Sequence, residues 1–143
     1  MTVSIILAGK GRDVVTIEPN ASLADAVELL AEKRIGAVLI PGADRRIVGI
    51  LSERDIVRAL AERGRGALDE PVSAAMTRKV STCNERDTIA NIMERMTIGK
   101  FRHMPVIEQG RLVGIVSIGD VVKHRVYEME RDSAALRDYI LTA

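Results

Sequence analysis

The chain has 143 residues, of which 47% are hydrophobic and 2% aromatic, so aliphatic side chains must fill its core. It carries 21 basic and 20 acidic residues, a net charge of +1, which gives no electrostatic reason to expect a nucleic acid partner. The single cysteine, Cys83, excludes an internal disulfide and a cysteine-built metal site. No apolar run approaches the roughly 18 residues that span a bilayer, and no signal-peptide pattern begins the chain. We therefore expect a soluble, cytoplasmic protein without membrane contact.

An internal repeat organises the chain. Residues 46–57 read RIVGILSERDIV and residues 111–122 read RLVGIVSIGDVV, with seven of twelve positions identical at an offset of 65 residues. Towards the N-terminus the match continues at an offset of 66, for example from Thr16 to Thr82. The one-residue slip falls in the turn at 41–45, where an insertion is tolerated. The pattern indicates two copies of one structural unit.

Each copy predicts a leading helical turn, a strand, a helix, two strands and a second helix. In the first copy these elements fall at residues 3–8, 14–17, 23–34 (ended by Gly36), 37–41, 47–51 and 53–63. In the second copy they fall at residues 72–76, 80–83, 88–98, 103–107, 112–116 and 118–129, and one further amphipathic helix follows at 127–143. The predicted domains are repeat 1 at 3–63, a linker at 64–71, repeat 2 at 72–130 and a helical tail at 131–143. The fold class is α/β of the α+β type, with two pseudo-twofold-related βαββα repeats packed through their sheets.

Both strand-to-helix junctions carry the sequence Gly-aliphatic-aliphatic-Ser-x-x-Asp, at Gly49–Asp55 and Gly114–Asp120. Free N–H groups at a helix start favour an anion such as phosphate. The serine hydroxyl can donate to phosphate, the carboxylate can accept from a ribose diol, and the glycine allows a close approach to the strand. Ser-x-x-Asp is also an ordinary capping box. One isolated copy favours the cap, two matching copies favour ligand binding, and one residue can do both.

The order of elements, the repeat offset and the paired motif resemble a tandem pair of CBS domains, a Bateman module, over roughly residues 3–130. HMPVI at 103–107 followed by GRLVGIVS at 110–117 is typical of a second CBS repeat, and VSAAMT at 72–77 resembles its lead-in. The resemblance implies a regulatory module without catalysis or a catalytic cofactor, which binds AMP, ADP, ATP, NAD(H) or S-adenosylmethionine in clefts between the repeats. AMP is the expected ligand. The resemblance also implies a homodimer, and the regulated partner protein is not identified.

The family pattern assigns roles to individual residues. The motif serines and aspartates would contact phosphate and ribose, the threonines of the first strands would lie against the base, and backbone around the second strands would line the adenine pocket. Arg54, Arg102 and His103 are expected to contact phosphate. Gly36–Ala37 in one copy matches Arg102–His103 in the other, so the two sites are expected to differ. The nucleotide-binding set is Thr16, Ala37, Val38, Ser52, Arg54, Asp55, Thr82, Arg102, His103, Met104, Pro105, Ser117 and Asp120, with no catalytic and no metal-binding residue.

Two other functions are weighed against this one. A structural or partner-interaction module with vestigial nucleotide sites would have the same sequence pattern, and only a binding measurement separates it from a sensor. An enzyme would need a nucleophile, base or metal cluster that converges on the cleft. The chain has only two histidines and no metal-ligand spacing such as H-E-x-x-H. We therefore expect no enzymatic activity.

Overall fold

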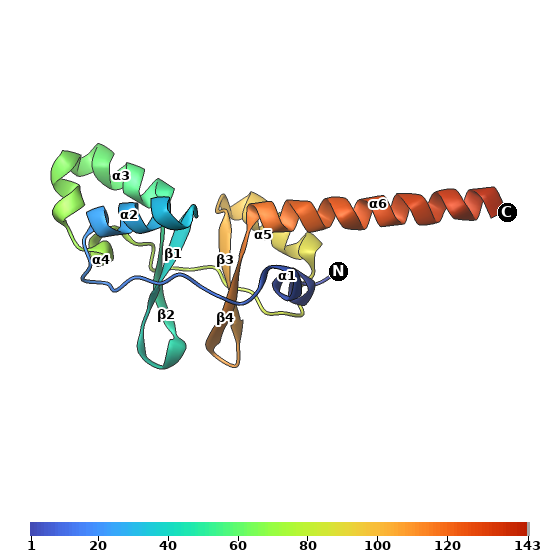
Figure 1. Ribbon diagram of the computed structural model, residues 1–143, viewed down its shortest axis with the longest axis horizontal. Coiled ribbons are helices and arrows are strands. Elements are labelled where there is room, and N and C mark those ends of the chain that lie inside the picture. Colours follow the sequence, from blue (N-terminus) through green and yellow to red (C-terminus); the bar gives the residue numbers. More distant parts are fainter. Residues whose placement is uncertain (143) are drawn as a thin grey trace. The chain divides into compact units, whose positions relative to one another are not determined.

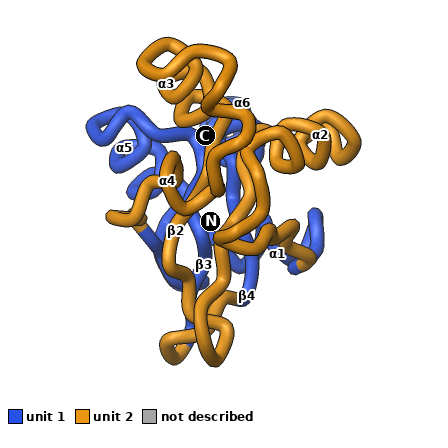
Figure 2. The backbone as a smooth tube through the Cα atoms, turned by 90° about the vertical axis from the view of Figure 1, so that its left-hand side faces the viewer, with its two compact units in different colours: residues 1–12, 82–108, 113–143 blue, residues 13–81, 109–112 orange. Residues whose placement is uncertain are grey.

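The computed structural model describes residues 1–142, which form a mixed helix-and-strand fold of the predicted α+β class (Figure 1). The chain divides into two compact units (Figure 2). Unit 1 contains residues 1–12, 82–108 and 113 onwards, and carries most of the second sequence repeat. Unit 2 contains residues 13–81 and 109–112, and carries the first repeat. No helix in the described part of the chain is both long and apolar enough to cross a membrane.

Unit 2 is built around an antiparallel hairpin. Its elements are α2 (Leu23–Lys33), β1 (Ala37–Pro41), η1 (Ala43–Arg45), β2 (Ile47–Ser52), α3 (Glu53–Arg63), η2 (Gly64–Asp69) and α4 (Val72–Ala75). β1 pairs with β2 so that Ala37 lies opposite Ser52. Isolated bridges extend this sheet on both sides, from Thr16 to Leu39 and from Ile50 to Thr77. The apolar faces of the helices cover the hairpin in a core that includes Leu23, Ala26, Leu30, Val38, Ile40, Leu51, Ile56 and Val72.

Unit 1 has the same plan. Its elements are α1 (Val3–Lys10), α5 (Ile89–Gly99), β3 (His103–Glu108), β4 (Arg111–Ser117), whose first two residues belong to unit 2, and α6 (Ile118–Thr142). β3 and β4 form a two-stranded sheet, which a parallel bridge from Cys83 to Val106 extends. The core includes Val3, Ile6, Leu7, Ile89, Ile92, Met96, Met104, Val106, Val116 and Val121. The chain has no Trp, and its single Phe, Phe101, only packs against this core, so aliphatic and methionine side chains fill it.

The leading helices are exchanged between the repeats. α1 precedes the first repeat in sequence but packs in unit 1, where the Val3 N–H donates to the Asp87 carbonyl at 2.9 Å. α4 precedes the second repeat but packs in unit 2, where the Val72 N–H donates to the Ala21 carbonyl at 2.7 Å. Each compact unit is therefore made from segments that are distant in the sequence.

Some predicted boundaries are wrong for local reasons. α2 ends with Arg34 in the left-handed conformation (φ 55°), and α5 ends with Lys100 in the same way (φ 57°), so Gly36 is not the residue that ends the first helix. The first strands of both repeats reduce to single bridges, and part of the predicted linker forms η2.

The predicted separate helix at 127–143 is instead continuous with the one before it. α6 runs unbroken from Ile118 to Thr142, because residues 120–142 contain no Gly or Pro that would end a helix. Residue 143 lies outside the described residues.

Candidate functional site

In unit 2, the junction from β2 to α3 is closed by a capping box. The Ser52 backbone N–H donates to Asp55 Oδ2 at 2.9 Å, and the Ser52 hydroxyl donates to the same oxygen at 3.2 Å. The Asp55 N–H donates in return to Ser52 Oγ at 3.4 Å. This reciprocal pair satisfies N–H groups that a helix start leaves without partners. The local cap predicted from Ser-x-x-Asp is therefore present.

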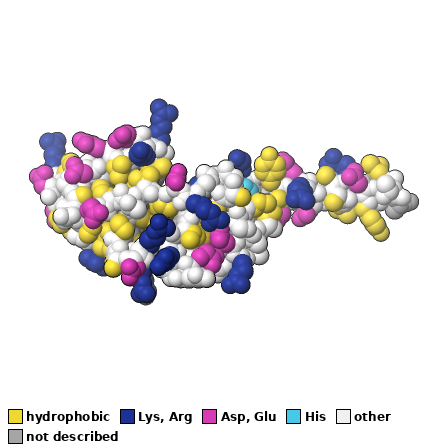
Figure 3. Space-filling view, turned by 60° about the horizontal axis from the view of Figure 1, so that its bottom comes forward, with side chains coloured by type: hydrophobic (Ala, Val, Ile, Leu, Met, Phe, Trp, Pro, Cys, Tyr) yellow, Lys and Arg dark blue, Asp and Glu magenta, His cyan; other side chains and the backbone are white. Residues whose placement is uncertain are grey.

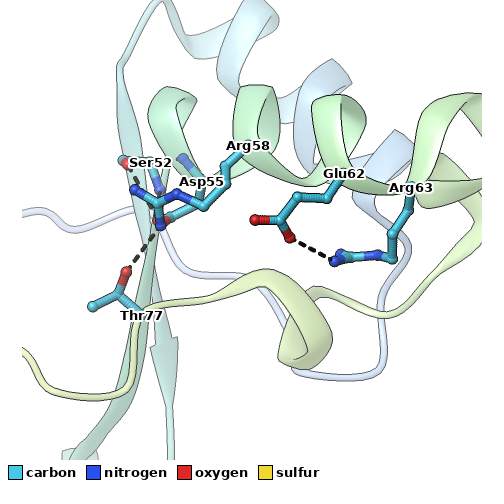
Figure 4. A network of polar contacts seen from close by, with 6 residues as sticks. All are labelled: Ser52, Asp55, Arg58, Glu62, Arg63 and Thr77. Atoms are coloured by element: carbon cyan, nitrogen blue, oxygen red, sulfur yellow. Dashed lines mark hydrogen bonds and ion pairs between the residues drawn. The ribbon is translucent and has the colours of Figure 1, made fainter.

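Asp55 has further partners and is only 5% exposed. The Thr77 hydroxyl donates to Asp55 Oδ1 at 3.0 Å, and an Arg58 guanidinium nitrogen lies 3.5 Å from the same oxygen (Figure 4). Thr77 lies just beyond α4, and Arg58 lies one turn further along α3. A buried carboxylate is costly unless it is hydrogen-bonded and paired. Asp55 therefore links the start of α3, through hydrogen bonds, to the segment that follows α4.

The equivalent junction of unit 1, from β4 to α6, has the same cap but a different outer partner. The Ser117 N–H donates to Asp120 Oδ2 at 2.9 Å, and the Asp120 N–H donates to Ser117 Oγ at 3.2 Å. The Lys10 ammonium, at the end of α1, donates to Asp120 Oδ2 at 2.7 Å and to the Ile115 carbonyl at 3.1 Å. The Asp120 side chain is 23% exposed, so it is more accessible than Asp55.

The surroundings of Asp120 lower the pKa of its carboxyl group. Desolvation by burial is the largest single influence and raises this pKa. The hydrogen bonds from Lys10 and Ser117, together with the positive charge of Lys10, outweigh it and hold the pKa below its ordinary value. Asp120 is therefore ionised at neutral pH and has a cation beside it.

Each motif glycine leaves space for a side chain of the same unit, from Leu7 within α1 or from Met76 directly after α4. A Cβ atom on Gly49 would lie 2.6 Å from Met76 Sδ, and one on Gly114 would lie 2.7 Å from a Leu7 methyl carbon. At such distances a larger residue would force the Met76 or Leu7 side chain to move, and at Gly49 it would also crowd the Thr77 carbonyl oxygen at 3.1 Å. The sequence predicts a close approach at these glycines. In the structure, side chains of the protein's own core make that approach. The same contact orients the leading helix, whose end reaches the aspartate.

In unit 2, three of the predicted ligand-contacting residues lie on adjacent strands. Thr16 bridges to β1, and Ala37 at the start of β1 lies opposite Ser52 at the end of β2. The Glu53 N–H donates to the Gly36 carbonyl at 3.0 Å, which brings the start of α3 against the start of β1. Val38 is fully buried in the core, so only its backbone can face a ligand.

In unit 1, the matching residues occupy matching places. The Ile118 N–H donates to the Arg102 carbonyl at 2.8 Å, which brings the start of α6 against the start of β3. Pro105 accepts at its carbonyl from the Cys83 N–H at 3.0 Å, and Thr82 accepts at its carbonyl from the Arg95 side chain at 2.6 Å. Met104 is fully buried, so its side chain belongs to the core. Arg54 and His103, in their respective units, both have interaction partners.

A pocket of about 510 Å³ in unit 2 lies between α2 and the start of α3. Its lining is mainly apolar and includes Val27, Leu30, Ile56 and Val57. Gly36 and Glu53 border it, but Ser52 and Asp55 do not. It is therefore a neighbour of the predicted site and does not coincide with it.

Three residues around the carboxylates were not found by sequence reasoning: Lys10, Thr77 and Arg58. Arg58 could have been found, because it lies three residues beyond Asp55 on one helix face. Lys10 and Thr77 had no local signal. They reach the aspartates only because the leading helices pack beside the strand-to-helix junctions.

The remaining reactive side chains take no evident part in the site. Cys83 is buried, and desolvation, with the nearby negative charges of Asp87 and Glu108, raises the pKa of its thiol to about 12. His124 Nδ1 lies 2.9 Å from the Asp120 carbonyl within α6. Among the described residues, no group of three or more His, Cys, Asp or Glu side chains could hold a metal ion.

The sequence matches the CBS domain family over residues 11–62 and 72–127. Among curated proteins it is 35% identical over 111 residues to an uncharacterised 17.7 kDa protein of Acidianus ambivalens, covering 77% of this chain and 66% of that protein. It is 31% identical over 147 residues to the mitochondrial CBS domain-containing protein CBSX3 of Arabidopsis thaliana, covering 97% of this chain and 71% of that protein. The chain thus spans about two thirds of the length of these relatives.

Solved structures agree with the sequence match. The CBS-domain containing protein ATU1752 of Agrobacterium tumefaciens has a TM-score of 0.85 and 49% identity, covering 87% of this chain and 99% of that one. PAE2072 of Pyrobaculum aerophilum, complexed with AMP, has a TM-score of 0.73 and 31% identity, covering 84% and 89%. The CBS domain pair of MJ0100, in complex with 5′-methylthioadenosine and S-adenosyl-L-methionine, has a TM-score of 0.78 and 26% identity, covering 90% and 98%.

The chain is thus a pair of βαββα repeats, each with a Gly-x-x-Ser-x-x-Asp junction. This defines a class of module for which ligand-bound structures are known. The chain belongs to the CBS domain family and carries two CBS domains.

Proposed function

We propose that this chain is a regulatory, non-catalytic sensor of adenosine-type ligands, with AMP as the first candidate. The observation that carries the proposal is the junction of unit 1, where an ionised Asp120 and the Ser117 hydroxyl lie together at the start of α6. Two relatives of the same fold are recorded in complex with AMP, or with 5′-methylthioadenosine and S-adenosyl-L-methionine. Both ligand sets share an adenosine moiety.

Each junction supplies the chemistry that an adenosine ligand needs. Asp120 carries acceptor oxygens for the two ribose hydroxyls, and Ser117 and the first N–H groups of α6 favour phosphate. The guanidinium of Arg102 and the imidazole of His103, at the start of β3, are the proposed phosphate contacts in unit 1. Thr82 and the backbone at Met104 and Pro105 are proposed to hold the adenine.

In unit 2 the corresponding set is Thr16 with the backbone of Ala37 and Val38 for the base, and Ser52, Arg54 and Asp55 for ribose and phosphate. Asp55 is almost fully buried and already has a hydroxyl and a guanidinium at Oδ1. A ribose would have to displace one of these contacts. We therefore propose that unit 1 binds the ligand more tightly than unit 2.

Binding regulates only if the ligand prefers one of two states of the protein. The coupling free energy is typically about 1–3 kcal/mol. We propose that the responding element is the homodimer, in the cytoplasm, and that its protein partner reads the change.

Isothermal titration with AMP, ATP, NAD(H) and S-adenosylmethionine tests the proposal, with Asp120→Ala as the main variant. Loss of a hydrogen bond to a charged acceptor costs about 1.5–3 kcal/mol, which corresponds to about 10- to 150-fold in Kd. The matched control is Asp25→Ala, because Asp25 also stands three residues after a capping serine, Ser22, but outside the proposed site. Equal AMP affinity of both variants would contradict the assignment of Asp120.

The alternative is a structural or partner-interaction module with vestigial sites. The exposed apolar residues along α6, among them Leu136 and Ile140, favour some protein contact. No saturable binding of any of the four ligands would support this alternative and end the sensor proposal. Turnover of ATP or NAD by the purified chain would contradict the proposed lack of enzymatic activity.

A further inference from the structure

Helix α6 carries an exposed apolar stripe that runs along most of its length. Figure 1 shows α6 continuing past α1 and α5 of its own unit, and Figure 3 shows hydrophobic side chains along it among charged ones. The stripe, named here the α6 seam, consists of Val122, Val126, Met129, Ser133, Leu136 and Ile140. Successive members are alternately four and three residues apart, which is the spacing of the a and d positions of a coiled coil. All its apolar members are exposed.

The α6 seam is not the face that packs on the helix's own unit. Of the α6 residues that the structure describes, Val121 alone is buried. Seven residues on, Glu128 accepts from the N-terminal ammonium of Met1 at 2.9 Å, which marks the same face. Val122 and Met129 each lie one residue further along, so the seam is turned by about 100° from that face. A solvated helical segment of a few turns is marginal in water, so an apolar seam on it calls for a partner.

We infer that the α6 seam binds the same seam of a second copy of this chain, in a parallel, in-register two-stranded coiled coil. Val126, Ser133 and Ile140 take the a positions, and Val122, Met129 and Leu136 take the d positions. Val126 and Ile140 are β-branched residues at a, and Leu136 is a leucine at d, the combination that favours a two-stranded coil. Ser133 places one small polar residue at an a position, where polar residues favour a single register.

The charges beside the seam select the parallel orientation. The e positions are Lys123, Glu130 and Arg137, and the g positions are Arg125, Asp132 and Tyr139. In a parallel coil, each g residue meets the e residue five positions further along the other helix. Arg125 then faces Glu130 of the second copy, and Asp132 faces Arg137. Both pairs join opposite charges, and the twofold axis repeats each of them.

An antiparallel pairing of the same seam brings like charges together. With full overlap, Glu130 would face Glu130, Lys123 would face Arg137, and Asp132 would face Asp132 of the second copy. Like charges across such an interface suppress the wrong pairing. The sequence therefore discriminates against the antiparallel alternative at three positions.

Of the two favourable pairs, the one between Asp132 and Arg137 carries more weight. Arg125 already forms an ion pair with Glu128 on its own helix, so Glu130 of a second copy would compete for the guanidinium. Asp132 is exposed, so its carboxylate is accessible to a neighbouring helix. Tyr127 and Leu141 are exposed but lie off the seam.

Disulfide trapping of the full-length protein tests the inference. Ser133→Cys is nearly isosteric and places two thiols opposite each other in the parallel coil, whereas antiparallel pairing puts position 133 opposite position 129. Ala134→Cys, one residue off the seam, is the matched control. Native Cys83 does not interfere, because it is buried and its thiol pKa is about 12. Under mild oxidation we expect covalent dimer from Ser133→Cys several-fold above that from Ala134→Cys.

Charge exchange then tests the orientation in the Ser133→Cys background. Arg137→Glu should lose most of the cross-linking, because it faces Asp132, and adding Asp132→Lys should restore it. Leu136→Asp should abolish cross-linking and lower helicity by circular dichroism, whereas Leu141→Asp, which is 78% exposed but off the seam, should do neither. Equal cross-linking at positions 133 and 134, or no rescue by the double charge exchange, would overturn the parallel coil. Each readout is independent of nucleotide binding, so it stands or falls separately from the sensor proposal.

Discussion

The ammonium group of Lys10 donates to Asp120 Oδ2 at 2.7 Å, whereas in the other unit the hydroxyl of Thr77 donates to Asp55 Oδ1 at 3.0 Å. Each donor stands at or just beyond the end of a leading helix. The two junctions are alike in backbone and in capping, and each carboxylate has a cation nearby, but that cation is Lys10 of the leading helix in unit 1 and Arg58 of α3 itself in unit 2. The leading segment therefore contributes a charged donor to unit 1 and a neutral hydroxyl to unit 2.

Replacing Lys10 by Met should raise the pKa of Asp120. Burial would still favour the neutral carboxyl, while the hydrogen bond and the charge of Lys10, which lower the pKa, would be lost. A pH titration of the carboxyl carbon by NMR measures this directly. Lys33→Met, at the last turn of α2 in unit 2, is the control and should leave the Asp120 titration unchanged.

The stability of the protein should fall at acid pH partly through Asp120. Its pKa is lower folded than unfolded, so its stabilising contribution is present above the unfolded pKa and is lost as the pH falls through the folded pKa. Because the pair with Lys10 is partly exposed, we expect no more than about 1 kcal/mol from the salt bridge itself. Urea unfolding at neutral and at acid pH should show a smaller pH dependence for Asp120→Asn than for the wild type. If Asp120→Asn shows the same change in unfolding free energy between the two pH values as the wild type, Asp120 does not contribute to the acid sensitivity.

Removing the Thr77 hydroxyl should destabilise the protein, because it leaves Asp55 Oδ1 short of a donor in a buried place. We expect Thr77→Val to lower the free energy of unfolding by about 1.5–3 kcal/mol, the usual range for a hydrogen bond to a charged group. Thr77→Ser keeps the hydroxyl and should recover most of this. If Thr77→Val and Thr77→Ser unfold at the same urea concentration, the hydrogen bond from Thr77 to Asp55 does not account for the stability at this position.

Adding a methyl group to the motif glycine of unit 2 should also destabilise the fold. In Gly49→Ala the new Cβ would meet Met76 Sδ at 2.6 Å and the Thr77 carbonyl oxygen at 3.1 Å. Overpacking of this kind costs about 1–3 kcal/mol. The comparison is Gly9→Ala in α1, where nothing lies within 4 Å. There the substitution should stabilise the helix by a few tenths to about 1 kcal/mol. The midpoint of thermal denaturation should therefore fall for Gly49→Ala and rise for Gly9→Ala.

Several features could be predicted from the sequence because they depend on neighbours along the chain. The Ser52 and Ser117 caps are reciprocal contacts across three residues, and helix α3 falls at the predicted 53–63. The helix end predicted at Gly36 was wrong, because Arg34 adopts the left-handed conformation itself. The prediction of two helices, at 118–129 and 127–143, was also wrong, because no local signal ends a helix between them.

The amino-acid sequence by itself determined the repeat, the order of elements and the duplicated junction, because these follow from periodicity and from contacts within one turn of chain. Only the tertiary structure decided which helix packs in which unit and which donor reaches each aspartate. Those contacts join residues 110 apart for Lys10 and Asp120, and 22 apart for Thr77 and Asp55. No local preference encodes such a pairing. It arises because Leu7 packs against Gly114, and Met76 against Gly49, so that the end of each leading helix lies beside its junction.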